Sequence, residues 1–130
     1  MSLFNMFGIA GSGVSAQARR LNVIASNLAN ADSVAGPDGQ AYKARQLSFQ
    51  SESQGGGVQV TGVTESDAPG RRVHDPAHPM ADAEGYVTHS NVNVVDEMVN
   101  MLSASRAYQN NLEVMNTARQ LLAKTLQMGQ

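Results

Sequence analysis

Apolar side chains recur at every seventh position through the C-terminal part of the chain. This series consists of Val94, Met101, Tyr108, Met115 and Leu122, and the three- and four-residue spacings between them hold Met98, Leu112 and Leu126. Such a stripe is typical of the seam of a coiled coil. It predicts a helix from about Asn93 to Met128. At about 1.5 Å per residue this helix would be roughly 50 Å long, whereas a compact domain of this chain length has a radius of gyration of about 14 Å.

The residues at both ends of this segment match the preferences of helix termini. Asn93 can cap the N-terminus with its side-chain oxygen, and Asp96 and Glu97 lie where the helix dipole favours carboxylates. Gly129 is a natural stop, and neither Pro nor Gly interrupts the run. We therefore expect one uninterrupted helix.

A second helical stripe occupies residues 3–31. Its members are Phe7, Val14, Leu21 and Leu28, seven apart, with Phe4, Ala18, Ile24 and Ala25 beside them. Gly8, Gly11 and Gly13 weaken the first half, each by about 1 kcal/mol relative to Ala. We expect a firm helix from about Ser12 to Ala31 and a looser segment before it.

The polar positions of this N-terminal helix carry amides and hydroxyls. Arg19 and Arg20 are its only charged residues before Asp32, and Ser, Asn and Gln fill the other polar positions. Such groups can form hydrogen bonds across a packed interface without the cost of desolvating an ion. The pattern indicates a helix that is buried on most of its sides.

The middle of the chain predicts short strands between turns. Turn signals occur at 36–39, 55–57, 69–70 and 75–76, and strand candidates at 42–49, 58–63, 71–73 and 86–87. The predicted fold class is therefore α+β and helix-dominated, with long N- and C-terminal helices paired as a coiled-coil-like domain and a small β-hairpin module inserted between them. We expect residues 1–32 and 92–130 to supply the helices and residues 33–91 the β-rich insert.

Composition and charge exclude several function classes. The net charge of −2 gives no electrostatic basis for binding nucleic acid, and no cysteine is available for disulfides or metal ligation. No apolar run approaches the roughly 20 residues that span a bilayer. The apolar stretch at Leu3–Ala10 lacks a preceding Lys or Arg, so we expect no cleaved signal peptide.

Two local patterns suggest ligand binding but lack the expected context. Residues 11–16 spell G-x-G-x-x-A with Asp32 following, yet a dinucleotide fingerprint requires a strand before it, and a helix is predicted here. His74, Asp75 and His78 resemble a metal cluster, but Pro76 and Pro79 prevent helical ligand spacing and no fourth ligand has a fixed spacing. Ser, His and Asp are present without a nucleophile elbow. We therefore expect no enzyme, cofactor or metal. A small soluble nucleotide- or metal-binding domain is the alternative, and a membrane-surface protein is a third reading that the sparse Lys and Arg disfavour.

The two stripes define the residues that we expect to form a coiled-coil seam or subunit interface. These candidates are Phe7, Val14, Leu21, Ile24, Leu28, Met98, Met101, Arg106, Tyr108, Leu112, Met115, Leu122 and Leu126. Arg106 with Tyr108 fits a specific interface contact, because both residue types are enriched at buried anchors. An Arg whose stem lies along a helix face is the alternative.

Several motifs resemble those of a known protein family. They are Ser12-Gly13-Val14, Ala16-Gln17, Leu21-Asn22, Ala25 and Asn27-Leu28-Ala29-Asn30, followed in the C-terminal half by Gly85-Tyr86-Val87, Asn91-Val92-Asn93, Glu97-Met98, Arg106-x-Tyr108 and Asn111. This set is similar to the terminal signatures of bacterial flagellar rod and hook proteins. Pro37-Asp38-Gly39 with Tyr42, and Asp75-Pro76-x-His78-Pro79, narrow the resemblance to subunits of the proximal rod.

The resemblance implies a structural role in the flagellar basal body. It implies terminal helices paired in a coiled-coil domain that lines the rod, and a helical array that transmits torque to the hook. It also implies export through the flagellar type III apparatus, without a cleaved signal, to a periplasmic position. The expected partners are other rod subunits, the membrane-ring and export-gate junction proteins at the rod base, and copies of the chain itself, with no nucleic acid and no direct lipid binding.

Overall fold

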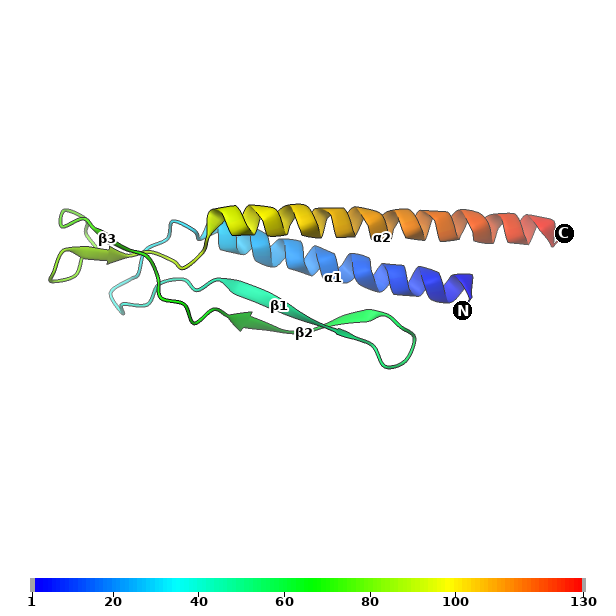
Figure 1. Cartoon of the computed structure of the whole chain (residues 1–130), viewed down its shortest axis with the longest axis horizontal. Helices are drawn as coiled ribbons and strands as arrows, with labels where there is room; N and C mark the ends of the chain where they lie inside the picture. The colour runs from blue at the N-terminus through cyan, green and yellow to red at the C-terminus, as the bar shows by residue number, and fades with distance from the viewer. Residues whose placement is uncertain (1, 130) are drawn as a thin grey trace. The chain divides into compact units, whose positions relative to one another are not determined.

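Two long helices at the chain ends flank four short strands in the sequence. The computed structural model describes residues 2–129. The elements in order are α1 (Leu3–Ala29), β1 (Arg45–Ser51), β2 (Val58–Glu65), β3 (Arg72–His74), β4 (Tyr86–Thr88) and α2 (Val94–Met128), as Figure 1 shows. The predicted helix-dominated α+β class is confirmed, and each predicted strand overlaps an observed one. The insert contains two two-stranded sheets, β1–β2 and β3–β4.

The chain divides into two compact units, each of which takes a part of both helices. Unit 1 contains the residues up to Leu21, Leu47–Gly62 and the residues from Met101 onward, and unit 2 contains Asn22–Gln46 and Val63–Asn100. The three-part division expected from the sequence follows the order of elements along the chain and stays a prediction. The two units are described separately below.

In unit 1 the two helices run antiparallel and approach closely at a glycine. A Cβ atom built on Gly13 would lie 2.9 Å from Cγ, Nδ2 and Oδ1 of Asn111, and one built on Gly11 would lie 3.8 Å from Cε of Met115. The contacts advance along α1 as they recede along α2, which defines the antiparallel sense. Four buried alanines belong to the same unit and help to keep its helix surfaces narrow: Ala10, Ala16, Ala104 and Ala118.

The first turns of α1 correct one expectation from the sequence. We expected a looser segment before Ser12, but the helix is continuous from Leu3. Gly13 does not interrupt it, because the absence of a side chain there allows the close contact with α2. The propensity cost of glycine, about 1 kcal/mol relative to Ala, is offset by packing. Gly8 has no such contact, since nothing lies within 4 Å of a Cβ atom placed on it.

The tip of the β1–β2 hairpin is attached to α1 within unit 1. Glu52 donates its backbone N–H to the carbonyl of Gly57 at 2.7 Å and so closes the turn, which Gly55 and Gly56 form with positive φ angles of 96° and 77°. Ser12 Oγ accepts a hydrogen bond from the N–H of Val58 at 3.0 Å and donates one to the carbonyl of Ile9 at 2.6 Å. One hydroxyl therefore links the hairpin to the helix backbone.

Unit 2 has a small core around the second hairpin. β3 and β4 pair antiparallel with Val73 opposite Val87, and Val87 is 1% exposed. Ala35 donates its N–H to the carbonyl of Thr88 at 2.7 Å, which extends the backbone pairing beyond β4. Within residues 2–129, no helix combines the length and apolar character needed to cross a membrane.

Asn93 caps the start of α2 as predicted. Its Oδ1 accepts hydrogen bonds from the N–H groups of Val95 at 3.1 Å and Asp96 at 3.2 Å. Asp96 and Glu97 occupy the first turn, where the positive end of the helix dipole stabilises their carboxylates. The predicted N-terminal boundary is confirmed.

The close helix contact predicts opposite outcomes for two glycine substitutions. Gly13→Val should lower the free energy of unfolding by about 1–3 kcal/mol, because its side chain must displace Asn111. Gly8→Val is the matched control and should leave stability unchanged or raise it by a few tenths of a kcal/mol, because valine has the better helix propensity. Urea unfolding followed by circular dichroism measures both. Equal effects of the two variants would contradict the close contact.

Candidate assembly interface

The predicted seam residues fall into two groups by exposure. Ile24 is buried, and the half-buried members are Val14, Leu21, Leu28, Met101, Tyr108, Met115 and Leu122. The exposed members are Phe7, Met98, Arg106, Leu112 and Leu126. The heptad series on α2 therefore lies on its covered face from Met101 to Leu122, whereas the intervening apolar positions lie outside that face. Whether any of these residues contacts another subunit stays a prediction.

Small and polar residues occupy the second row of the covered face of α2. This row consists of Glu97, Ala104, Asn111 and Ala118, seven apart and alternating with the Met101 series. Ala104 is fully buried, whereas Leu112 is 37% exposed and Met98 55%. The physical reason is distance, because the contact of α2 with Gly13 leaves room for alanine and asparagine but not for leucine. Sequence reasoning missed this row, although its own seven-residue spacing was a usable signal.

An apolar face of α2 is exposed near its N-terminus. Val95, Met98, Val99 and Leu102 have exposures of 68%, 55%, 60% and 64%. Their spacing of three, four and seven residues places them together on one side of the helix. We call these four residues the outer face of α2. A group of exposed apolar side chains on one helix face is a candidate interaction site.

A second apolar surface lies in unit 1. Met6 of α1 and Val114, Ala118 and Leu121 of α2 line a groove of about 430 Å³. The nearby N-terminal aromatic side chains are also exposed, Phe4 by 71% and Phe7 by 41%. Both helices of unit 1 therefore retain uncovered apolar side chains after packing on each other.

The Asn27 side chain joins α1 to the start of β1 in unit 2. Asn27 is 1% exposed. Its Oδ1 accepts hydrogen bonds from the Tyr42 hydroxyl at 2.9 Å and the Arg45 N–H at 3.0 Å, and its Nδ2 donates to the Arg45 carbonyl at 2.8 Å. One amide thus satisfies both backbone groups at the start of β1. These hydrogen bonds give Asn27, a member of the N-terminal motif, a structural role.

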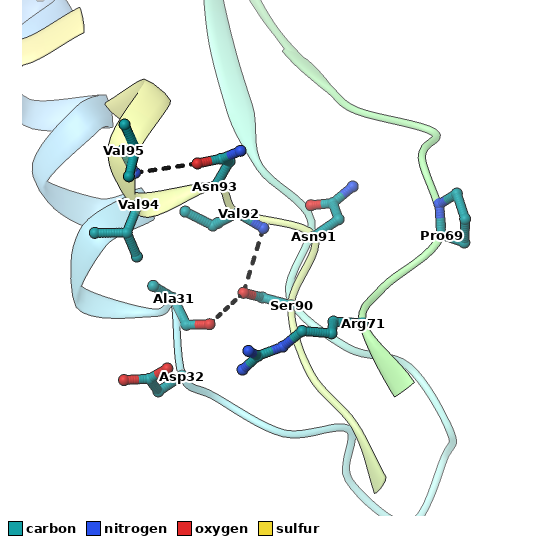
Figure 2. Close-up of a pocket in the computed structure, with 10 residues that line it drawn as sticks. All are labelled: Ala31, Asp32, Pro69, Arg71, Ser90, Asn91, Val92, Asn93, Val94 and Val95. Atoms are coloured by element: carbon teal, nitrogen blue, oxygen red, sulfur yellow. Dashed lines mark hydrogen bonds between the residues drawn. The ribbon is translucent and has the colours of Figure 1, made fainter. Parts of the chain in front are cut away.

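Asn91 and Ser90 connect the segment before α2 to three other segments of unit 2. Asn91 Oδ1 accepts the N–H of Ala44 at 2.6 Å, and its Nδ2 donates to the carbonyl of Ala68 at 2.9 Å. Ser90 Oγ donates to the carbonyl of Ala31 at 2.7 Å and accepts the N–H of Val92 at 3.4 Å. Figure 2 shows the Ser90 bonds beside the Asn93 cap. These side chains replace regular backbone pairing where the chain is irregular.

The two ligand-binding patterns have different structural settings. Residues 11–16 lie inside α1, whose backbone N–H groups are used within the helix, and no strand precedes it within residues 2–129. His74 packs edge-on against Tyr86 with ring centroids 4.9 Å apart, and His78 Nδ1 accepts the Met80 N–H at 3.0 Å. No group of three or more potential metal ligands occurs in the described part of the chain.

Asp82 holds the turn between β3 and β4 together. Its Oδ1 accepts the N–H groups of Tyr86 and Glu84, each at 2.9 Å, and its Oδ2 accepts a charge-assisted bond from Arg72 at 2.8 Å. The Tyr86 backbone bond, followed by the Glu84 bond and the Arg72 charge, lowers the pKa of Asp82. The Arg72 guanidinium also lies 4.7 Å from the centroid of the Tyr86 ring.

Family comparisons match both helical ends of the chain. The sequence model described as flagella basal body rod protein matches residues 7–37, which include most of α1 and Asn27. The model described as flagellar basal body rod FlgEFG protein C-terminal matches residues 83–128, which include β4, Asn91 and α2. The chain belongs to the flagellar basal-body rod protein family.

Within this family the chain is similar to FlgC proteins over its whole length. It is 57% identical to the flagellar basal-body rod protein FlgC of Salmonella typhimurium and to that of Yersinia enterocolitica, with 100% of both chains covered in each comparison. It is 44% identical to FlgC of Buchnera aphidicola subsp. Acyrthosiphon pisum, again with 100% of each chain covered. The resemblance to flagellar rod proteins drawn from the motifs is confirmed.

The Asn27 bonds predict a specific loss of stability. Asn27→Ala should lower the free energy of unfolding by about 1–3 kcal/mol, because it leaves backbone groups of Arg45 unpaired. Asn22→Ala, at an exposed position of the same helix, makes the same change in side chain and should stay within about 0.5 kcal/mol of the unmodified chain. Urea unfolding measures both. Equal losses would show that Asn27 does not support β1.

On acid titration, the turn that Asp82 holds should lose its stabilising hydrogen bonds only at low pH. Because the folded-state pKa of Asp82 is depressed, its stabilising contribution is present above the unfolded-state pKa of about 4 and is lost as the pH falls through the lower folded-state value. The NMR amide signal of Tyr86 should therefore shift only below about pH 4. In Asp82→Asn this shift should disappear. A Tyr86 transition at or above that pH would contradict the assignment.

Proposed function

We propose that this chain is a subunit of the proximal rod of the flagellum and assembles helically with copies of itself and other rod proteins. As a member of the rod protein family, it is a structural protein of the flagellar basal body. The proposal adds a hollow shaft, torque transmission, and contact with membrane-ring and export-gate junction proteins at the rod base. It includes no catalytic role. The chief support is the outer face of α2, which the folded chain leaves uncovered.

The outer face supplies a driving force for association. Complete burial of one large aliphatic side chain contributes about 1.5–3 kcal/mol, and this face holds four side chains that are each more than half exposed. Part of that gain offsets the entropy lost on association. A face that binds a different surface on the next subunit forms a heterologous contact, which generates a helical filament when it does not close into a ring.

The proposed route to the rod is export through the flagellar type III apparatus to the periplasm without a cleaved signal. The apolar faces of the helices find partners only in the assembled rod under this proposal. Unassembled subunits would then have weakly held ends, which suits passage through a narrow channel and delays polymerisation. Hydrogen exchange of the isolated chain would report on those ends.

A charge on the outer face of α2 should block assembly but leave the fold intact. Leu102→Asp places a carboxylate where a neighbouring subunit would desolvate it, and Leu102 is already 64% exposed in the chain itself. We expect a urea midpoint close to that of the unmodified protein, normal export, and at least a tenfold loss of the protein from purified basal bodies. Motility in soft agar should fall with it.

Gln109→Asp is the matched control for this experiment. Gln109 lies one heptad further along α2, is exposed, and is polar already, so its replacement should leave incorporation and motility near normal. Full incorporation of Leu102→Asp would remove the main support for the proposal. A fall in both variants would indicate sensitivity to charge in general rather than to this face.

A further inference from the structure

A polar cavity lies in unit 2 beside the first turns of α2. Its volume is about 420 Å³. The side chains that matter for its chemistry are Gln46, Ser66, Asn91, Asp96, Glu97 and Asn100. They supply two carboxylates together with amide and hydroxyl groups, and none is a Lys or Arg. The cavity therefore has the composition of a site for a cationic group.

Glu97 is a buried carboxylate whose Oε2 atom has no hydrogen-bond partner among the residues that the structure describes. The residue is only 7% exposed, and its Oε2 accepts no hydrogen bond from any residue that the structure describes. Removal of a carboxylate from water is costly unless hydrogen bonds or an opposite charge compensate. Its position in the first turn of α2 offsets part of this cost through the helix dipole. The remaining cost would be relieved by a cation in the cavity.

A guanidinium group fits this cavity better than a metal ion does. Residues 2–129 contain no cluster of three or more potential metal ligands, and the cavity is far larger than one ion requires. An arginine has five N–H donors in a planar fork that matches carboxylates, and its remaining donors can bond to amide oxygens. The Asp96 and Glu97 carboxylates with the Gln46 and Asn100 amides offer such a set.

We propose that this cavity receives an arginine side chain from a second copy of the chain in the assembled rod. The proposal rests on the proposed function. Arg19, Arg106 and Arg119 are exposed and lie on the two helices. The ion pairs found in the described chain, Arg45–Glu65 and Arg72–Asp82, use none of them. The chain therefore carries both halves of the contact, an orphaned carboxylate and arginines without an acid.

The first test separates assembly from folding. Glu97→Gln removes the charge but keeps the shape, so the urea midpoint of the isolated chain should be unchanged or higher, while the amount in purified basal bodies should fall at least tenfold. Glu84→Gln, an exposed carboxylate of the same unit, should behave as the unmodified chain in both measurements. A lower midpoint for Glu97→Gln would overturn the proposal, because the carboxylate would then have a partner within the chain.

The outcomes distinguish this inference from the proposed function. If the unmodified chain does not enter basal bodies, both fail. If the unmodified chain and Glu97→Gln enter equally well, the Glu97 contact fails while the rod assignment stands. Equal loss of Glu84→Gln and Glu97→Gln would also overturn the contact, because the effect would then follow net charge.

The second test identifies the occupant through disulfide cross-linking. The natural chain contains no cysteine, so introduced pairs report without background from this protein. Asn100→Cys at the cavity is combined with Ser15→Cys, Asn110→Cys or Asn116→Cys, each about one helical turn from one of the three arginines. Oxidation of basal bodies should yield a disulfide-linked homodimer for one pair and none for the single variants. Absence of the dimer for all three pairs would overturn a second copy as the occupant.

Discussion

The close approach of α1 and α2 at Gly13 is the constraint on which unit 1 depends. With Asn111 already within contact distance of the glycine, any larger residue at this point would separate the helices. The buried alanines of both helices follow from the same short separation. Large apolar residues are therefore displaced to other faces, where they remain exposed. The close contact between α1 and α2 and the exposed apolar side chains on their other faces therefore have the same physical cause.

In unit 2, hydrogen bonds from a few amide side chains hold the chain segments together. The hydrophobic core of this unit is small, and among the residues that the structure describes Ile24 and Val87 are its large buried apolar side chains. Asn27 and Asn91 pair with backbone groups of segments far apart in sequence. Such bonds have defined directions and lengths, so they fix the path of an irregular chain where apolar packing alone would allow several. The family motifs at these positions are explained by geometry.

Periodic and local features were predictable from the sequence, whereas contacts between distant residues were not. The seven-residue series of α2, the Asn93 cap and the four strand positions follow from spacing, capping and turn chemistry, and the structure confirms their places. The contact of Gly13 with Asn111 depends on which helix faces meet, and the seven-residue spacing of the row with Asn111 is a weaker signal for that face than the stripe of large apolar residues. For the same reason Ala104 was passed over in favour of Leu112, because alanine adds little to a hydrophobic stripe. Asn27 bonds to Tyr42, which lies before β1, and to Arg45 at the start of β1, so its role also required coordinates.

The Ser12 hydroxyl between α1 and the hairpin has a mechanical consequence. It bonds to the Ile9 carbonyl and the Val58 amide at once, so rotation of this part of α1 about its own axis would pull on the start of β2. Twisting of the helix is thereby coupled to shear along a strand, and hydrogen-bonded strands resist shear because several bonds must break together. Within unit 1, a single hydroxyl therefore ties the helix to the hairpin and opposes rotation of one against the other.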